Sequence, residues 1–171
     1  ATTPTQVIQS RSALLRRDGR VVAINGSPLV GFYVPVGNYH VAIRHRNHLG
    51  CMTNSPVAVS ASTPLLDLSV SSTPTWGTGA RANVNGTMVL WPGDVNFDHQ
   101  VMYTGTSNDR DPVLEEIGGV VPTAVVNGIY NGTDTDLNGN TKYTGSLNDR
   151  DIILQTIGGV VPTAVRQEQI P

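Results

Sequence analysis

Oxygen-bearing side chains recur on alternate residues at two places in this chain, forty residues apart. They are Asp94, Asn96 and Asp98 in the first run, and Asp134, Asp136 and Asn138 in the second. A hard cation such as Ca²⁺ takes about six to eight oxygen ligands, and a tightly wound loop turns positions 1, 3 and 5 of such a run inward. The alternative is that these Asp and Asn residues only form turns, where both residue types are common. We favour two calcium loops.

Two further loop positions fit this prediction. Position 7 supplies a backbone carbonyl in a calcium loop, which here falls on Gln100 and Asn140. Position 6 is normally glycine, because the chain turns sharply there. Gly139 follows this rule, whereas His99 departs from it and makes the first loop the less regular one.

The ligand that closes each loop is displaced from its usual place. The twelfth position of the first loop is Gly105, which offers no carboxylate, but acidic residues return at 108–111 and 148–151. Asn at the start of each of these runs is a good helix N-cap, so the second Asp would lie in the first helical turn. We therefore predict a longer loop, which contains Tyr-Thr-Gly and is closed by Asp111 and Asp151. The second candidates are Asp109 and Asp149.

The two loops belong to a duplicated unit, residues 94–125 and 134–165. Eight of the ten aspartates of the chain lie in these loops. Four carboxylates crowded into one loop repel one another unless a cation lies between them, which favours two bound Ca²⁺ ions. Each copy continues with a short apolar helix, PVLEEIGG or IILQTIGG, whose glycine pair suits a left-handed C-cap.

The duplicated loop-and-helix unit resembles a type I dockerin, whose two EF-hand-like calcium loops run D-x-N-x-D-G and end in Asp before a helix. The longer motifs YTG, NDRD, IGG and PTA resemble a dockerin-like module at the C-terminal end of large secreted surface proteins of Bacteroidota-type bacteria. The resemblance also covers RSALLRRDG, PVGNYHVAIRHRNHLG, SPVAVS and MVLWPGDVNFD, which is nearly the whole chain. His99 and Cys51 depart from its pattern. It implies a bacterial calcium-binding surface protein.

The first half of the chain is rich in short β patterns. Asp18-Gly19 is a hairpin signal, and Arg44 and Arg46 lie on the polar side of an alternating segment, from which we expect them to bond the acidic half. Strands are predicted over 6–15, 20–24, 39–46, 56–60, 66–70 and 80–90. The predicted architecture is mainly β. It comprises a small immunoglobulin- or transthyretin-like β-sandwich over 1–92, followed by a dockerin-like calcium loop-helix module over 93–171.

Charge and composition exclude several classes of partner. Residues 1–93 carry seven arginines against two aspartates, or +5, whereas residues 94–171 carry four bases against eleven acids, or −7. Two calcium ions would bring the second half to −3, so we expect neither nucleic acid nor an anionic membrane as partner. No apolar run approaches the about 18 residues that a membrane span needs. Weak calcium loops are saturated only outside cells, so we predict an extracellular or cell-surface location.

The sequence predicts no enzyme. It contains no nucleophile elbow, zinc-protease helix, Walker loop or dinucleotide fingerprint, and its paired carboxylates occur where calcium would hold them. His45, His48 and Cys51 have the ligand types of a transition-metal site, but structural zinc sites need four ligands. We favour a polar surface turn there, with an incidental cysteine.

The predicted function is structural: a subunit of an extracellular fibre. The resemblance implies one more apolar strand before the position of Ala1, and its absence would leave a sheet edge open. A neighbouring copy can fill such an edge with segment 5–15 or 160–170, and head-to-tail strand addition yields a filament. The alternatives are a dockerin-like or lectin-like binding module cut from a larger secreted protein, and an appendage of an enzyme.

Glycans are a second class of partner. The sequence offers three N-glycosylation motifs, and Tyr33 and Trp76 are candidates for sugar stacking, with the core as the alternative for both. The motifs begin at Asn25, Asn85 and Asn131, and we favour coincidental turns over glycosylation at these positions.

Overall fold

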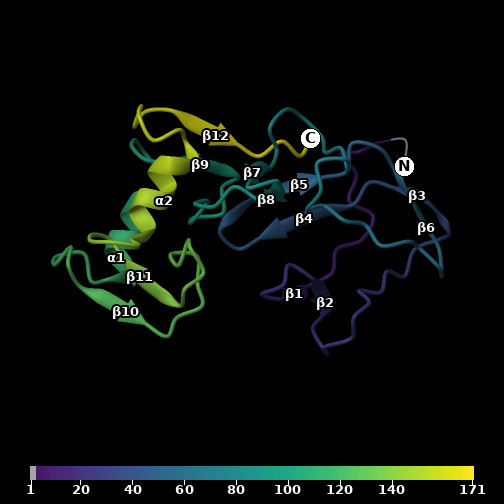
Figure 1. The fold of residues 1–171 in the computed structure, drawn as a ribbon, viewed down its shortest axis with the longest axis horizontal. Helices are drawn as coiled ribbons and strands as arrows, with labels where there is room; N and C mark the ends of the chain where they lie inside the picture. Colours follow the sequence, from purple (N-terminus) through teal and green to yellow (C-terminus); the bar gives the residue numbers. More distant parts are fainter. Residues whose placement is uncertain (1–2) are drawn as a thin grey trace. The chain divides into compact units, whose positions relative to one another are not determined.

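The computed structural model describes residues 3–171, whose regular structure is mainly β with two short helices (Figure 1). This confirms the predicted class. The strands of the described residues form six antiparallel sheets of two strands each. Neither helix in this part of the chain is long and apolar enough to cross a membrane.

The described chain divides into two compact units. The first comprises the residues up to His40 together with Pro56–Leu65 and Pro171, and the second comprises Val41–Ser55 and Leu66–Ile170. The predicted boundary lay at residue 92. The contacts instead group residues 41–55 and 66–92 with the acidic half.

The first unit holds two small sheets. Strand β1 (Ala13–Leu15) pairs with β2 (Val21–Ala23), and the turn between them contains Asp18-Gly19, as predicted. The Asp18 carboxylate accepts the Arg20 N–H at 3.1 Å, and Gly19 takes a φ of 81°. Strand β3 (Gly37–Tyr39) pairs with β6 (Val57–Val59). Regular pairing is therefore short here, and the strand predicted over 6–15 is confined to its last three residues.

Two hairpins belong to the second unit. Strands β4 (Ala42–His45) and β5 (His48–Met52) form the first, and β7 (Ala82–Val84) and β8 (Thr87–Val89) form the second. The prediction of one strand over 80–90 was wrong. Asn85 and Gly86 both take positive φ, 52° and 89°, and this is the Asn-Gly turn that joins paired strands. The segment 66–70 forms no strand.

The two copies of the repeat interlock. Helix α1 (Arg110–Glu116) and helix α2 (Asp149–Thr156) contact each other (Figure 1). Strand β9 (Gln100–Met102) of the first copy pairs with β12 (Val165–Gln167), which follows α2. Strand β10 (Val125–Asn127), which follows α1, pairs with β11 (Asn140–Lys142) of the second copy. Each copy thus closes the sheet of the other.

The shared core lies between these elements. Val113 of α1 and Ile153 of α2 are fully buried, and Leu49 of the β4–β5 hairpin packs into the same cluster. Both helices end as predicted: the glycine pairs 118–119 and 158–159 all take positive φ. The core therefore joins three segments that are distant in sequence, and it holds both acidic loops on one frame.

Candidate metal centre

The first acidic loop is wound by its own side chains. The Asp94 Oδ1 and Asn96 Oδ1 atoms both accept the Asp98 N–H at 3.0 Å, and Asp98 Oδ1 accepts the Gln100 N–H at 3.0 Å. Phe97 and His99 take left-handed φ values of 59° and 71°. His99 thus adopts the conformation that glycine normally supplies at position 6.

The second loop repeats this winding. Asp134 Oδ1 and Asp136 Oδ1 accept the Asn138 N–H at 2.9 and 3.1 Å, and Asn138 Oδ1 accepts the Asn140 N–H at 2.8 Å. Leu137 and Gly139 take the same left-handed conformation, at 61° and 84°. Because two different sequences adopt one backbone path, the alternate spacing of Asp and Asn determines the loop shape.

A buried carboxylate at the start of each helix closes each loop. Asp109 Oδ1 accepts the Val95 N–H at 2.7 Å, and its Oδ2 accepts the Met102 N–H at 2.7 Å. In the second copy, Asp149 makes the equivalent bonds to the N–H groups of residues 135 and 142, at 2.6 and 2.8 Å. Each carboxylate therefore ties the beginning of its loop to the strand that follows. Its remaining lone pairs stay available for a cation.

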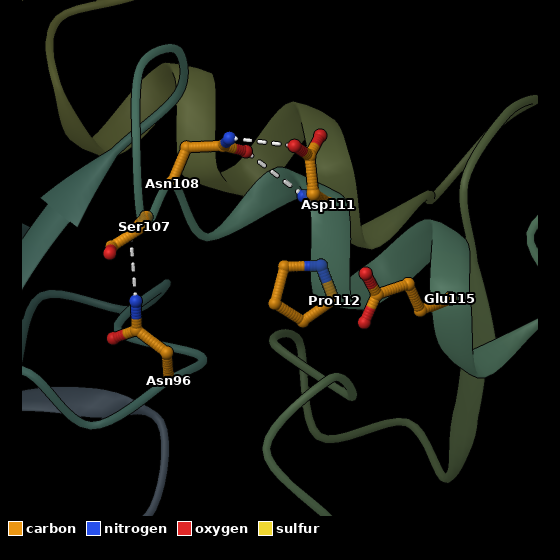
Figure 2. Close-up of a pocket in the computed structure, with 6 residues that line it drawn as sticks. All are labelled: Asn96, Ser107, Asn108, Asp111, Pro112 and Glu115. Atoms are coloured by element: carbon orange, nitrogen blue, oxygen red, sulfur yellow. Dashed lines mark hydrogen bonds between the residues drawn. The ribbon is translucent and has the colours of Figure 1, made fainter.

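The residues first predicted to close the loops, Asp111 and Asp151, bond the helix starts rather than the loop backbone. Asp111 Oδ2 accepts a bond from Asn108 Nδ2 at 2.8 Å, and the Asp111 N–H donates to Asn108 Oδ1 at 3.0 Å (Figure 2). Arg110 pairs with the other oxygen of Asp111 at 3.0 Å. Asp151 makes the same contacts with Asn148 and Arg150. The structure thus places Asp111 and Asp151 in helix caps, and it brings the second candidates, Asp109 and Asp149, to the loops.

A shallow hollow lies beside α1. Its volume is about 360 Å³, and it separates Asn96 from Glu115 (Figure 2). Asn96 Nδ2 donates to the Ser107 carbonyl at 2.8 Å, which leaves its Oδ1 directed to the loop backbone. The hollow is lined by Asn96, Ser107, Asn108, Asp111, Pro112 and Glu115.

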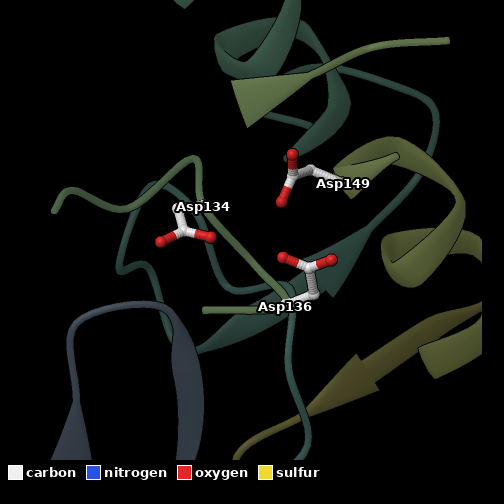
Figure 3. Close-up of side chains that lie close together, drawn as sticks. All are labelled: Asp134, Asp136 and Asp149. Carbon is white, nitrogen blue, oxygen red and sulfur yellow. The ribbon is translucent and has the colours of Figure 1, made fainter. Parts of the chain in front are cut away.

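Three carboxylates converge in the second loop. Asp134, Asp136 and Asp149 each offer an oxygen within 4.8 Å of the others (Figure 3). Asp134 and Asp149 are buried, and Asp136 is exposed. In residues 3–171 no other group of three His, Cys, Asp or Glu side chains is close enough to hold a metal. The first loop has Asn96 where the second has Asp136, so its equivalent trio includes an amide.

In the first loop, one buried carboxylate oxygen has no hydrogen-bond partner. Asp94 is fully buried, and its Oδ2 atom has no hydrogen-bond partner. A buried carboxylate oxygen without a partner is costly, so such groups normally bind a donor or a cation. The residues present therefore fit a cation with oxygen ligands.

Burial disturbs the protonation of these carboxylates. Burial, reinforced by the Asp98 charge, raises the pKa of Asp94 to about 6. Burial also raises the pKa of Asp109 to about 7, against the lowering effect of the backbone N–H groups that it accepts. In contrast, the hydrogen bond from Asn108 lowers the pKa of Asp111. Among the described residues, no arginine or lysine forms an ion pair with Asp94 or Asp109, whereas Arg110 pairs with Asp111.

The position-7 residues begin the strands that leave the loops. Gln100 is the first residue of β9 and lies opposite Gln167, and Asn140 is the first residue of β11 and lies opposite Asn127. Both therefore stand where the loop backbone straightens. Their side chains are partly buried.

The β4–β5 turn also reaches the second loop. Arg46 Nε donates to the Asn131 carbonyl at 2.8 Å, and Arg44 pairs with Glu168 at 2.8 Å. The expected contact of both arginines with the acidic half is therefore confirmed.

The sequence did not predict the contact of Asn47 with the second loop. Asn47 is fully buried, and its Nδ2 donates to the carbonyls of Gly132 and Asp134 at 3.1 and 2.6 Å. An asparagine in a turn gives no sequence signal for such a distant contact.

The histidine pair lies beside this turn. The Nδ1 atoms of His45 and His48 are 3.1 Å apart. Burial, with the neighbouring His45 and Arg46 charges, lowers the pKa of His48 to about 3, and burial raises the pKa of the Cys51 thiol to about 11. Both residues are therefore neutral near pH 7 in the metal-free protein.

Comparison with known protein families, curated proteins and solved structures finds no match for this chain.

Proposed function

We propose that residues 94–165 form a two-site calcium module that stiffens a non-enzymatic, extracellular structural protein. The observation that carries the proposal is the fully buried Asp94 carboxylate, whose Oδ2 has no partner inside a loop wound around it. Support also comes from the second loop, where the carboxylate oxygens of Asp134, Asp136 and Asp149 lie within 4.8 Å of one another. Calcium would bring a double positive charge to the carboxylates of each loop.

The proposed ligands follow the geometry of the two loops. Oxygen-only ligand sets suit Ca²⁺, which accepts flexible coordination, better than Mg²⁺, which dehydrates reluctantly. The proposed first set is Asp94, Asn96, Asp98, the Gln100 carbonyl and Asp109, and the proposed second set is Asp134, Asp136, Asn138, the Asn140 carbonyl and Asp149.

A bound ion in each loop would link three elements. The closing carboxylates Asp109 and Asp149 start the helices and already accept N–H groups from both sides of their loops. An ion held by the same carboxylates would resist separation of loop, strand and helix. Ions that bind only the folded state stabilise it by mass action, about 2.7 kcal/mol per site at a hundredfold excess over Kd.

The direct test is calcium removal from the full chain. Thermal melts in millimolar calcium and in excess EDTA, together with elemental analysis after dialysis, should show a lower Tm on chelation and two ions per chain. Magnesium at the same concentration should restore little of the Tm. An unchanged melt with no metal in the protein would refute the calcium module.

The proposal extends to the architecture of the two halves of the chain. We assign residues 1–92 to a small β-sandwich and 93–171 to a dockerin-like module. The duplicated loop, helix and strand order of the two copies supports the second assignment. An experimental structure in calcium tests both.

The assembly into a fibre is a second candidate function, and the first unit favours it. Val22 is the one buried hydrophobic side chain among the described residues of this unit. Several of its large apolar side chains are exposed, for example Leu29 at 78%, Val36 at 81% and Leu65 at 93%. Exposed apolar surface of this kind commonly marks an interaction site. Strand addition from a neighbouring copy would cover it.

Light scattering in millimolar calcium and electron microscopy of the native material test the fibre. Filaments, or a mass that rises with concentration, would support strand exchange between copies. A strictly monomeric chain would instead favour the alternative, a dockerin-like or lectin-like binding module. Pull-down with candidate partner domains and with glycan arrays would then identify its ligand.

A further inference from the structure

A guanidinium lies beside the carboxylates of the second loop. Arg46 Nη2 is 3.9 Å from Asp134 Oδ2, and this nitrogen is buried without a hydrogen-bond partner. The rest of the side chain is held firmly. Its Nε donates to the Asn131 carbonyl at 2.8 Å, and its guanidinium stacks 3.6 Å from the centre of the Tyr130 ring.

The neighbouring Asn47 fixes the turn that carries Arg46. Its side-chain amide donates to two carbonyls of the second loop, those of Gly132 and Asp134, and its Oδ1 lies 2.7 Å from His48 Nδ1. Because Asn47 is fully buried, this turn cannot move away without leaving polar groups unpaired. Arg46 is thus a fixed charge at the loop rather than a mobile surface cation.

The first loop has no equivalent charge. Both proposed ligand sets contain three carboxylates, so the loops start with the same negative charge. Within residues 3–171, no arginine or lysine forms an ion pair with Asp94, Asp98 or Asp109. Asp94 Oδ2 has no partner, whereas the equivalent Asp134 Oδ2 accepts the Gly139 N–H at 3.1 Å and faces Arg46.

We infer that Arg46 is a built-in counter-ion of the second loop that competes with calcium and makes the two sites unequal. The inference rests on the proposed calcium module. A guanidinium keeps its charge at every pH at which the protein folds, so it repels an incoming dication and stabilises the metal-free carboxylates. Without metal, Nη2 faces Asp134 Oδ2 at 3.9 Å, and a cation bound to Asp134 would compete with this contact.

The test is the substitution Arg46→Met in the full chain. Calcium titrations followed by NMR report each loop separately, through the Gly139 amide for the second loop and the His99 amide for the first. We expect the calcium affinity of the second loop to rise about fivefold or more, the lower end of ordinary coupling between sites. The affinity of the first loop should stay unchanged, and the Tm of the metal-free protein should fall.

Matched variants separate charge from structure. Arg46→Lys keeps the charge and should leave the affinity of the second loop near the wild-type value. Arg44→Met removes an arginine of the same hairpin whose partner is Glu168, and it should change neither loop. If Arg46→Met does not fold, Arg46→Gln removes the charge while it keeps a donor for the Asn131 carbonyl.

The outcomes distinguish this inference from the function on which it rests. A second-loop affinity that falls or does not change in a folded, neutral Arg46 variant would show that Arg46 only clamps the loop, and the inference would be overturned. Failure of the wild-type chain to bind calcium at either loop would refute the proposed function instead.

Discussion

The Thr104 hydroxyl donates a 2.9 Å hydrogen bond to the Pro162 carbonyl, and forty residues later the Thr144 hydroxyl donates a 2.8 Å bond to the Pro122 carbonyl. Each threonine follows the loop strand of one copy and bonds the segment after the helix of the other. The exchanged strand pairs β9–β12 and β10–β11 repeat this reciprocity. Neither copy therefore has a complete sheet or helix contact by itself.

A core substitution should disturb both loops at once. Ile153→Ala removes a fully buried side chain from the cluster that Val113, Val101 and Leu49 share, and we expect it to cost about 2–5 kcal/mol of unfolding free energy. Val160→Ala, at a position 84% exposed, should change stability by no more than about 0.5 kcal/mol. Denaturant unfolding should show a single transition in both variants. Separate transitions for the two copies would contradict the interlocked module.

The closing residue can be identified by paired substitutions. Asp109→Asn removes a charge from the proposed first site and should weaken its calcium affinity by at least about tenfold, the effect seen even for groups one shell away from a metal. Asp111→Asn affects the start of α1 and should cost about 0.3–1 kcal/mol of stability, with the affinity nearly unchanged. Calorimetric titration of both variants measures the difference. The reverse order would restore Asp111 as the closing ligand.

The repeat made much of this site predictable. An offset of forty residues identified equivalent loops, helices and glycine ends, and the structure bears out the helices and their left-handed termini. Which of the two carboxylates at each helix start faces the loop was harder to predict. The run Asn-Asp-Arg-Asp offers two carboxylates two residues apart. Because the helix begins between them, Asp109 faces the loop while Asp111 accepts a bond from Asn108.

Contacts between distant segments were not predictable from local patterns. Nothing near Asn47 indicates that its amide reaches the Gly132 carbonyl, and nothing near Val165 indicates that it pairs with Met102. In the first half, alternation of side chains predicted longer strands than the structure contains. The Asn85-Gly86 turn divides one of them, because a positive φ at both residues reverses the chain.

Calcium binding should release protons near pH 6. The pKa of Asp94 is raised to about 6 and that of Asp109 to about 7 without metal, so both hold a proton in the folded apo-protein up to these values. Their contribution to apo stability is present below the unfolded pKa, about 3.9, and is lost as pH rises through 6–7. Calcium requires the ionised form, so its affinity should rise over this range.

Calorimetry in buffers of different ionisation enthalpy counts these protons. More protons should be released per calcium at pH 6 than at pH 8, and Asp111→Asn should leave the count unchanged because a hydrogen bond from Asn108 already lowers the pKa of Asp111. A count that is the same at both pH values would show that the loop carboxylates are ionised before calcium binds.

Glu168 should be the most sensitive acidic residue outside the loops. Its side chain is 5% exposed, accepts Arg44 Nη2 and the Gly50 N–H, both at 2.8 Å, and its own N–H donates to the His99 carbonyl at 2.9 Å. It thus joins the β4–β5 hairpin to the first loop. Glu168→Gln replaces the carboxylate that accepts these two donors with a buried neutral amide. We expect the free energy of unfolding to fall by about 1–3 kcal/mol.

Gly50→Ala probes the same contact from the other side. A Cβ at Gly50 would lie 2.6 Å from Glu168 Oε2 and 2.8 Å from the Ile43 carbonyl, so the hairpin has no room for it. Glu168→Gln and Gly50→Ala should both lower the Tm. Glu115→Gln, on the exposed face of α1, should not. Because Glu168 bonds the backbone of His99, chemical shifts of the first loop should change in both variants while those around Gly139 stay fixed. Equal chemical-shift changes in the two loops would show that Glu168 does not act on the first loop through His99.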